Sequence, residues 1–463
     1  MNKNKIHRLD LKTKVFYACG NLGIGFVGIT HMLYLIYFFF PPKDAGLPYV
    51  IPQGSLLFGL TVLGLITALG RLVDAITDPL IATWSDNCEH PKGKRTVFMR
   101  RTSLFFAGAY VLVFFVPLPD SIYSINVGWI ALMLVLAALF QTIYTIPHNA
   151  LLVEIAEHPD DKVDLTTFSS MFWFAAFLCV SFSSFVWNFL QVQFDLTLAT
   201  AMKYTFGLMC GIGFIFLMVP AIFIKENKYK KQNAKQAERI PFKKSLKLVL
   251  SNKNFCILLC WSALYNVATY FFECGLIYYI TVLALKKAQM QGPLSIIIGA
   301  ITLASYPFVN HFAKKIHKIK IVKLGFILFM LMFVCLSVMG LWGIPIYVML
   351  ALVIVFAPLP QSIFGMLVGA MSADCAAWGE ATSKENVAGM YMAAGGFVAK
   401  IGATLATILF TSLLLFGKDV GDDLGIRFIT IVGVILCALG LIFAQKYNEK
   451  EVMSYAKKKI RTK

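Results

Sequence analysis

Long apolar stretches recur from one end of this 463-residue chain to the other. A helix needs about 20 apolar residues to cross a hydrocarbon core of about 30 Å. With 58% hydrophobic and only 14% charged residues, the composition is also unlike that of a soluble globular protein. The sequence therefore predicts an all-α membrane protein with twelve spans, near residues 14–40, 55–84, 101–118, 123–152, 166–190, 201–224, 251–283, 291–312, 320–341, 344–372, 387–416 and 425–446.

Lysine and arginine gather in alternate connections between these spans. The segments KENKYKKQNAKQAERIPFKKSLK, KKIHKIKIVK and the terminal KKKIRTK are rich in them, whereas PLPDSIYS and GKDVGDDLG are poor. Because basic loops are retained in the cytoplasm, we expect a multi-pass protein of the cell membrane, the bacterial inner membrane, with both termini cytoplasmic. This asymmetry accounts for the net charge of +18 without nucleic-acid binding.

One long hydrophilic connection divides the chain nearly in half. We expect an N-terminal six-helix bundle over 1–224 that holds a cation site, a basic cytoplasmic loop over 225–250, a C-terminal six-helix bundle over 251–446 and a basic tail over 447–463. Two bundles joined in this way are typical of transporters. A receptor, a channel and a membrane enzyme share the helical character, so the charges inside the spans have to distinguish them.

The second span carries Asp74 and Asp78 in the stretch RLVDAITDPL. Residues four apart project from the same side of a helix, so the two carboxylates converge. Like charges at close range disfavour joint ionisation, which leaves a shared proton or a bound cation between the oxygens. Arg71 is three residues before Asp74 and suits an ion pair with it, which gives a purely structural alternative for that acid.

Several motifs resemble those of the glycoside-pentoside-hexuronide cation symporters, a branch of the major facilitator superfamily. The most specific is DAITDPLIATWSDN at 74–87, followed by KGKR at 92–95; further matches are TIPHNAL at 145–151, the pair Tyr265 and Asn266, and SADCAAWGE at 372–380. The resemblance spans nearly the whole chain. It implies the twelve-helix major facilitator fold, with two six-helix bundles and substrate held between them.

The resemblance also implies a coupling site in the second and fourth spans. Carried over by position, the cation shell consists of Asp74, Thr77, Asp78 and Thr142. Carboxylate and hydroxyl oxygens suit a hard cation, and carboxylates also accept a proton. Sodium and proton both remain open as the coupling ion, and we expect no other cofactor and no other metal.

Three positions depart from the sugar-transporting members of that family. Those relatives carry an acid at the position of Gly25, another at the position of Thr145, and an arginine near Met171. Each of these charged groups would hold a sugar hydroxyl by a charge-assisted hydrogen bond worth about 1.5 to 3 kcal/mol. Their absence makes a melibiose-like disaccharide a poor candidate.

Polar and aromatic residues inside the spans are the candidates for substrate contact. We expect substrate at Asn21, Gln141, Tyr144, Thr145, Asn149, Trp173, Tyr265, Asn266, Glu273 and Lys400, with His31, His148 and Tyr270 as further polar residues of the spans. Glu273 is isolated in the middle of its span, where charge is costly and usually functional. One interpretation is that Glu273 carries a proton or binds substrate. The alternative is that it forms a structural ion pair with Lys400 or Arg71.

Charged residues near the span ends are candidates for gating. We place Arg71, Lys94, Arg95, Asp374 and Glu380 in this group, with a solvated loop face as the alternative for the last two. No nucleotide-binding loop or zinc-protease motif occurs in the sequence. We therefore expect that the protein is not an enzyme but a gradient-driven symporter for a small polar solute such as a sugar, glycoside or sugar acid. We expect it to be a monomer whose partners are that solute, the cation and the lipid bilayer.

Two other functions stay open at this level. Lysophospholipid symporters share the DAITDP signature, and the 40 phenylalanines of this chain suit a lipid-like substrate. An exporter or a sensor that keeps the fold is the other alternative, because fold alone does not fix function.

Overall fold

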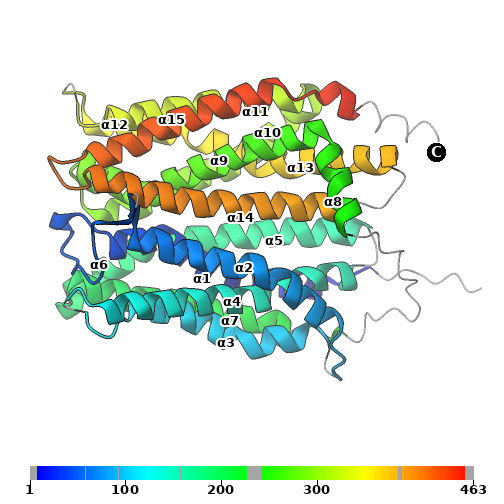
Figure 1. Cartoon of the computed structure of the whole chain (residues 1–463), viewed down its shortest axis with the longest axis horizontal. Helices are drawn as coiled ribbons and strands as arrows, with labels where there is room; N and C mark the ends of the chain where they lie inside the picture. Colours follow the sequence, from blue (N-terminus) through cyan, green and yellow to red (C-terminus); the bar gives the residue numbers. More distant parts are fainter. Residues whose placement is uncertain are drawn as a thin grey trace, which may run out of the picture. The chain divides into compact units, whose positions relative to one another are not determined.

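The computed structural model describes residues 8–57, 59–91, 93–119, 121–156, 159–226, 242–341, 343–383 and 388–453. These residues are almost entirely helical (Figure 1). The chain divides into two compact units: unit 1 comprises Met1–Ala234 with Gln289–Pro293, and unit 2 comprises Lys235–Ala288 with Leu294–Lys463.

Unit 1 is built from seven long or medium helices in its described part. They are α1 (Leu11–Phe39), α2 (Val62–Asp86), α3 (Thr96–Phe114), α4 (Ser124–Ile155), α5 (Pro159–Ser181), α6 (Ser183–Phe194) and α7 (Leu198–Phe223). Helix α1 packs against α5 and α7, while α4 packs against α2 and α3. Helix α3 also contacts α7, so the two sets of helices share one core. A single 3-10 turn, η1 (Lys43–Ala45), lies in the connection after α1.

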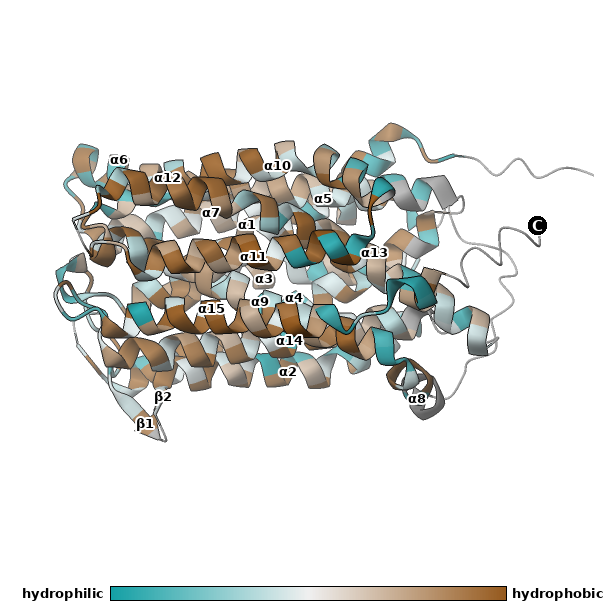
Figure 2. Cartoon of the chain, turned by 90° about the horizontal axis from the view of Figure 1, so that it is seen from above, coloured by the Kyte–Doolittle hydropathy of each residue, from teal (hydrophilic) through white to brown (hydrophobic). Residues whose placement is uncertain are grey.

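Unit 2 repeats this plan with eight helices among its described residues. They are α8 (Phe242–Ser251), α9 (Lys253–Tyr278), α10 (Gln291–Lys315), α11 (Lys318–Ser337), α12 (Ile346–Phe356), α13 (Pro358–Ser383), α14 (Ala388–Leu413) and α15 (Leu424–Gln445), with short turns η3 (Tyr279–Leu283), η4 (Ala288–Met290) and η5 (Leu414–Phe416). Residues 289–293, at the junction of η4 and α10, are grouped with unit 1. Helix α9 packs against α14 and α15, and α11 packs against α13 and α15. Figure 2 shows apolar residues along α11, α14 and α15, with hydrophilic residues toward the helix ends.

Eleven helical stretches among the described residues are long and apolar enough to cross a membrane. Helix α2 is not one of them, because Arg71, Asp74 and Asp78 interrupt its apolar sequence. At 25 residues it is long enough to span. Together with α2, the eleven stretches give the twelve spans that the sequence predicts.

The second span begins later than the sequence predicts. Residues 55–61 are not the start of a helix but form the hairpin strands β1 (Ser55–Leu57) and β2 (Leu60–Thr61). The turn between them includes Gly59, whose φ of 77° suits glycine. Thr61 then caps α2, because its hydroxyl accepts the backbone N–H of Gly64 at 3.0 Å. Local capping therefore overrides the apolar character of this segment.

Two predicted spans are each divided into two helices. The span at 166–190 breaks at Phe182, between α5 and α6. The span at 344–372 breaks at Ala357, and α13 begins at Pro358, where a proline without an N–H is tolerated in the first helical turn. The motif SADCAAWGE, which begins where the predicted span at 344–372 ends, lies in the last turns of α13.

The predicted loop at 225–250 contains a helix, because α8 occupies Phe242–Ser251. Residues 227–241 of that loop and residues 454–463 of the predicted basic tail lie outside the described part of the chain.

Candidate functional site

The two acids of α2 lie on the side of the helix that packs against α4. Asp74 is buried with 3% of its surface exposed, and Asp78 is half-buried. Neighbouring Leu72 and Ile76 are exposed, at 58% and 57%. The acids therefore face the interior of unit 1 or its edge, as intramembrane charge requires, and Leu72 and Ile76 point away from it.

Thr142 of α4 lies between the two carboxylates. Its hydroxyl is 3.2 Å from Oδ1 of Asp74 and 3.2 Å from Oδ1 of Asp78. A hydroxyl has one hydrogen, so it can donate to only one of these oxygens at a time. Both contacts are satisfied together when one carboxyl carries a proton or when a cation lies among the three oxygens. The structure thus brings together three of the four residues that the sequence assigns to the cation.

Arg71 neutralises part of this charge. Its Nη1 is 3.6 Å from Oδ2 of Asp74, so Asp74 faces Arg71 with one oxygen and Thr142 with the other. The ion pair anticipated from the sequence spacing is therefore present. It leaves the Oδ1 oxygens of both acids directed to Thr142.

Helix α2 lacks one backbone hydrogen bond beside Asp78. Pro79 follows it within the helix and cannot donate the hydrogen bond that the Ala75 carbonyl would receive in an unbroken helix. Thr77, the fourth predicted cation ligand, donates its hydroxyl hydrogen to the Val73 carbonyl at 2.8 Å. Its oxygen lone pairs, and not its hydrogen, are what it could offer to a cation.

A second polar cluster in unit 1 joins α1, α4 and α5. His148 is fully buried, and its Nε2 lies 3.0 Å from Nδ2 of Asn21, which also donates to the Ser169 hydroxyl at 3.0 Å. The His148 ring stacks on Tyr17 with a centroid distance of 4.3 Å. Gly20 allows this approach, because a Cβ there would lie 2.5 Å from the His148 ring. Of the predicted substrate ligands, only Asn21 belongs to this cluster.

The other predicted substrate residues of unit 1 are dispersed. Tyr144 is fully buried in the hydrophobic core and donates to the Leu217 carbonyl at 2.8 Å. Gln141 accepts a hydrogen bond from Tyr110 of α3. Thr145 is half-buried, whereas Asn149 and Trp173 are exposed. The polar groups of Tyr144 and Gln141 thus form hydrogen bonds to neighbouring helices.

Gly25 shows why an acid is missing from α1. A Cβ at this position would lie 2.5 Å from the Cβ of Ala176 and 3.6 Å from the ring of Trp173. Helix α5 therefore occupies the space that an acidic side chain would need. The glycine that replaces the acid of the sugar carriers therefore matches the close packing of α1 on α5.

In unit 2 the predicted substrate residues lie on α9 and α14. Tyr265 is buried and stacks on Phe364 at a centroid distance of 4.0 Å. Asn266, Glu273 and Lys400 are half-buried. Within the described part of the chain Glu273 makes no hydrogen bond or ion pair, so the structural pairing with Lys400 is not observed. Tyr270, one turn before Glu273, is 2.9 Å from the Thr407 hydroxyl of α14.

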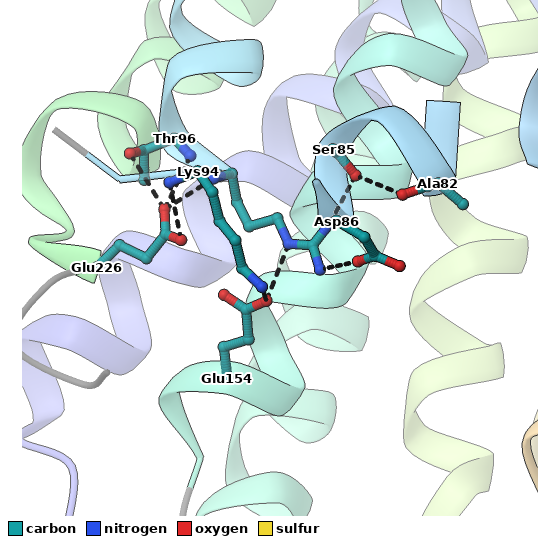
Figure 3. Close-up of polar contacts among 8 residues, drawn as sticks. Ala82, Ser85, Asp86, Lys94, Thr96, Glu154 and Glu226 are labelled. Carbon is teal, nitrogen blue, oxygen red and sulfur yellow. Dashed lines mark hydrogen bonds and ion pairs between the residues drawn. The ribbon is translucent and has the colours of Figure 1, made fainter. Parts of the chain in front are cut away.

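The predicted gating residues Lys94 and Arg95 lie in a network of acids at the α2–α3 connection (Figure 3). Nζ of Lys94 and Nε of Arg95 are each 2.9 Å from Oε1 of Glu154 at the end of α4. Arg95 also pairs with Asp86 and donates to the Ser85 hydroxyl at 2.5 Å. Burial lowers the pKa of Arg95, but the bonds to Asp86 and Glu154 outweigh it and raise the pKa above its usual value. The guanidinium therefore stays charged.

Glu226, just after α7, binds the start of α3 in the same network. Its carboxylate accepts the backbone N–H groups of Lys94, Arg95 and Thr96 at 3.0, 2.8 and 3.2 Å. Gly93 of the KGKR motif makes room: its φ is 117°, and a Cβ there would collide with Glu226. Acids are favoured at a helix N-terminus, where N–H groups lack intrahelical partners.

Unit 2 contains a matching contact. Glu449, after α15, accepts the backbone N–H groups of Lys318 and Ile319 at the start of α11, both at 3.0 Å. The side chain of Lys318 pairs with Asp374 of α13 at 2.5 Å. Asp374 thus meets a lysine, as a gating role requires, whereas Glu380 makes no polar contact within the described residues.

Sequence reasoning missed the acids Glu154, Glu226 and Glu449. Glu154 is separated from Arg95 by 59 residues, and Glu226 by 131, so no local spacing connects them. The one available signal was position, because each acid directly adjoins the cytoplasmic end expected for a span.

Comparison with known proteins gives the family. The model of the family described as "MFS/sugar transport protein" matches residues 16–448. "Uncharacterized symporter YjmB" of Bacillus subtilis (strain 168) is 21% identical over 321 residues, which span 69% of this chain and 65% of that protein. "Putative glycoside/cation symporter YagG" of Escherichia coli (strain K12) is 23% identical over 255 residues, 54% of this chain and 50% of that protein.

A solved structure confirms the fold. The crystal structure of a D-xylose-proton symporter superposes with a TM-score of 0.67 at 13% identity, covering 94% of this chain and 97% of that one. An identity this low speaks for the fold alone. The predicted twelve-helix major facilitator fold is confirmed, and the protein is a multi-pass membrane transporter rather than an enzyme. The chain belongs to the family of MFS/sugar transport proteins, which confirms its resemblance to the glycoside-pentoside-hexuronide cation symporters.

Proposed function

We propose that this protein is a cation-coupled symporter that takes up a small polar solute, a sugar, glycoside or sugar acid, by alternating access. The names of both relatives support symport, and one of them refers to glycoside and cation. The coupling ion is sodium or a proton, bound in unit 1 at Asp74, Asp78 and Thr142.

The contact of one hydroxyl with two carboxylates carries this proposal. Thr142 lies at 3.2 Å from both Asp74 and Asp78, and its single hydrogen cannot serve both. A monovalent cation or a proton resolves the competition. Loss of that ion restores repulsion between the acids, and this change in interaction free energy is what can couple ion binding to a conformational equilibrium.

Arg71 makes the two acids unequal. Its Nη1 lies 3.6 Å from Oδ2 of Asp74 and compensates part of the charge of that acid. Asp74 is also the deeper of the two, at 3% exposed. Asp78 is half-buried and therefore more exposed than Asp74, so an ion can reach it more readily. We therefore assign the exchangeable ion chiefly to Asp78 and the fixed charge to Asp74.

Reconstituted vesicles test this function. Wild-type protein should accumulate a radiolabelled pentose, glycoside or hexuronate when sodium or protons are supplied as an inward gradient, and Asp74→Asn and Asp78→Asn should abolish accumulation while leaving folded protein. Asp44→Asn, at an exposed position, is the matched control. Full accumulation by either α2 variant would refute the coupling assignment.

The identity of the ion is tested separately from the solute. Sodium-dependent heat or tryptophan fluorescence in detergent should be seen with wild type and lost in Asp78→Asn, if sodium is the ion. Uptake that ignores sodium and collapses with a protonophore assigns the proton instead. Sodium binding without uptake of any of the three solute classes would keep the coupling site and reject the substrate class.

The chain is further proposed to lie in the cell membrane with both termini in the cytoplasm. The basic connections between alternate spans support this orientation by the positive-inside rule. A reporter that is active only outside the cytoplasm, fused after residue 453, should be inactive, and the same reporter inserted at residue 420 should be active.

A further inference from the structure

Helix α8 lies at the membrane surface because it directly adjoins a span. It ends at Ser251, and the membrane-spanning α9 begins at Lys253. Only Asn252 separates the two helices. In Figure 1, α8 runs across the direction of α9 and α14. A helix that ends one residue before a span and crosses its direction has to lie near the lipid headgroups.

Asn252 fixes the angle between α8 and α9. It is buried, its side-chain oxygen caps α9 by accepting the Phe255 N–H at 3.1 Å, and its amide donates to the Tyr391 hydroxyl at 3.0 Å. Tyr391 of α14 in turn packs on Gly379 of α13, where any Cβ would collide with the tyrosine ring. The joint is therefore tied to the segment that holds Asp374 and Glu380.

The sequence of α8 combines apolar residues with lysines. In FKKSLKLVLS the apolar residues lie at 242, 246, 248, 249 and 250, of which 242, 246 and 249 recur at helical spacing, and the lysines occupy 243, 244 and 247. Val249 is fully buried, and α8 contacts α9, α13 and α14 of the same unit. Lys247 and Leu250, three residues apart on another side, are exposed, Leu250 to 53%.

From Arg239 to Phe272 the sequence carries charge of one sign only. Between Arg239 and Phe272 the sequence contains five basic residues, Arg239, Lys243, Lys244, Lys247 and Lys253, and no acid. Lys253 is exposed as well as Lys247. Exposed lysines beside an exposed leucine at a membrane surface match a lipid leaflet whose headgroups are negative and whose interior is apolar.

We propose that α8 is a docking surface for anionic phospholipid headgroups of the adjoining leaflet. The exposed Lys247 contacts the headgroup phosphates, the other lysines in the sequence of α8 add positive charge to the same segment, and Leu250 enters the boundary of the acyl chains. Through Asn252 and Tyr391 this contact holds the ends of α13 and α14. Anionic lipid is thereby a regulator of the transporter, and this regulation does not depend on which solute or ion the protein carries.

Hydrogen exchange of the full-length protein in nanodiscs tests the proposal. Phosphatidylcholine alone is compared with an equal mixture of phosphatidylcholine and phosphatidylglycerol, and exchange of the α8 amides is read by mass spectrometry. Each lysine at an anionic surface contributes about fivefold in affinity, so we expect α8 to exchange at least about tenfold more slowly in the mixture. High salt should remove the difference, because it screens exposed charges.

Two variants that lose the same number of charges distinguish an effect of the α8 lysines from an effect of the net charge of the protein. Lys243→Gln/Lys244→Gln/Lys247→Gln should exchange alike in both lipids, whereas Lys43→Gln/Lys286→Gln/Lys287→Gln should keep the wild-type difference. Equal exchange of wild-type α8 in both lipids would overturn the proposal, even if the first variant failed to fold. A difference that survives in the α8 variant, or disappears in the control, would also overturn it.

Discussion

Glu226 accepts the backbone N–H of Arg95 at 2.8 Å, and through this contact the end of α7 holds the start of α3. Glu449 does the same in unit 2 when it accepts the N–H of Lys318 at 3.0 Å. In each unit an acid just after the last span satisfies N–H groups at the start of the third span. The two halves of the chain therefore fasten the same pair of helices by the same chemistry.

Loss of this cap should destabilise unit 1. Glu226 is 2% exposed, and Glu226→Gln removes a buried charge that three N–H groups share. We expect a loss of about 1 to 3 kcal/mol, seen as a fall of roughly 5 °C in the Tm of the purified protein. Glu380→Gln, which removes an acid without polar contacts among the described residues, should leave the Tm unchanged. Equal Tm values for the two variants would contradict the cap.

The Thr142 hydroxyl should set the affinity for the coupling ion. Thr142→Val keeps the shape of the side chain and removes the oxygen that contacts Asp74 and Asp78. The half-saturating ion concentration for uptake should rise about tenfold or more, in line with a hydrogen bond to a charged group. Thr142→Ser keeps the hydroxyl and should remain close to wild type. A serine variant as impaired as the valine variant would point to packing instead.

Gly25 should resist even a single added carbon. Gly25→Ala places a Cβ 2.5 Å from that of Ala176, and overpacking of this kind costs about 1 to 3 kcal/mol. Gly28 lies on the same helix with nothing within 4 Å of an added Cβ, so Gly28→Ala should be neutral or slightly stabilising. The measurement is the Tm of each purified variant. Equal Tm values for Gly25→Ala and Gly28→Ala would show that α1 and α5 are less closely packed at Gly25.

Glu273 should matter for transport more than for stability. Because it has no polar partner among the described residues, Glu273→Gln breaks no ion pair, and the amount of protein in membranes should stay close to wild type. Uptake normalised to that amount should fall if Glu273 carries a proton or holds substrate.

The double variant with Lys400→Met distinguishes the structural alternative. If Glu273 and Lys400 formed a pair in another conformation, the single change would strand a buried ammonium at a cost of about 3 to 5 kcal/mol. Removing Lys400 as well would then restore both abundance and uptake. Continued loss of uptake in the double variant supports the direct role of Glu273.

Most of the span pattern could be predicted because hydropathy acts locally along the chain. The positions of α1, α4 and α7 follow from apolar length alone. The exceptions have local chemical causes that hydropathy does not register, such as the Thr61 cap of α2 and the proline that starts α13.

Within the site, the Asp74 and Asp78 pair followed from helical spacing, and the part of Thr142 followed from the resemblance. The assignments of Tyr144 and Gln141 to substrate stay predictions, and the structure engages both side chains in contacts between helices. A polar residue in a span can face either a cavity or a neighbouring helix, and the sequence does not encode which neighbour it meets.

By itself the sequence determined that the chain crosses a membrane many times, where its buried acids lie along α2, and which family it joins. These properties depend on residue type and on spacing within one helix, so no distant contact is needed to read them. Only the tertiary structure decided that Thr142 meets both acids, that α5 fills the space beside Gly25, and that Glu154 and Glu226 hold Arg95. Those contacts join residues far apart in the chain, and their energy exists only once the helices have packed.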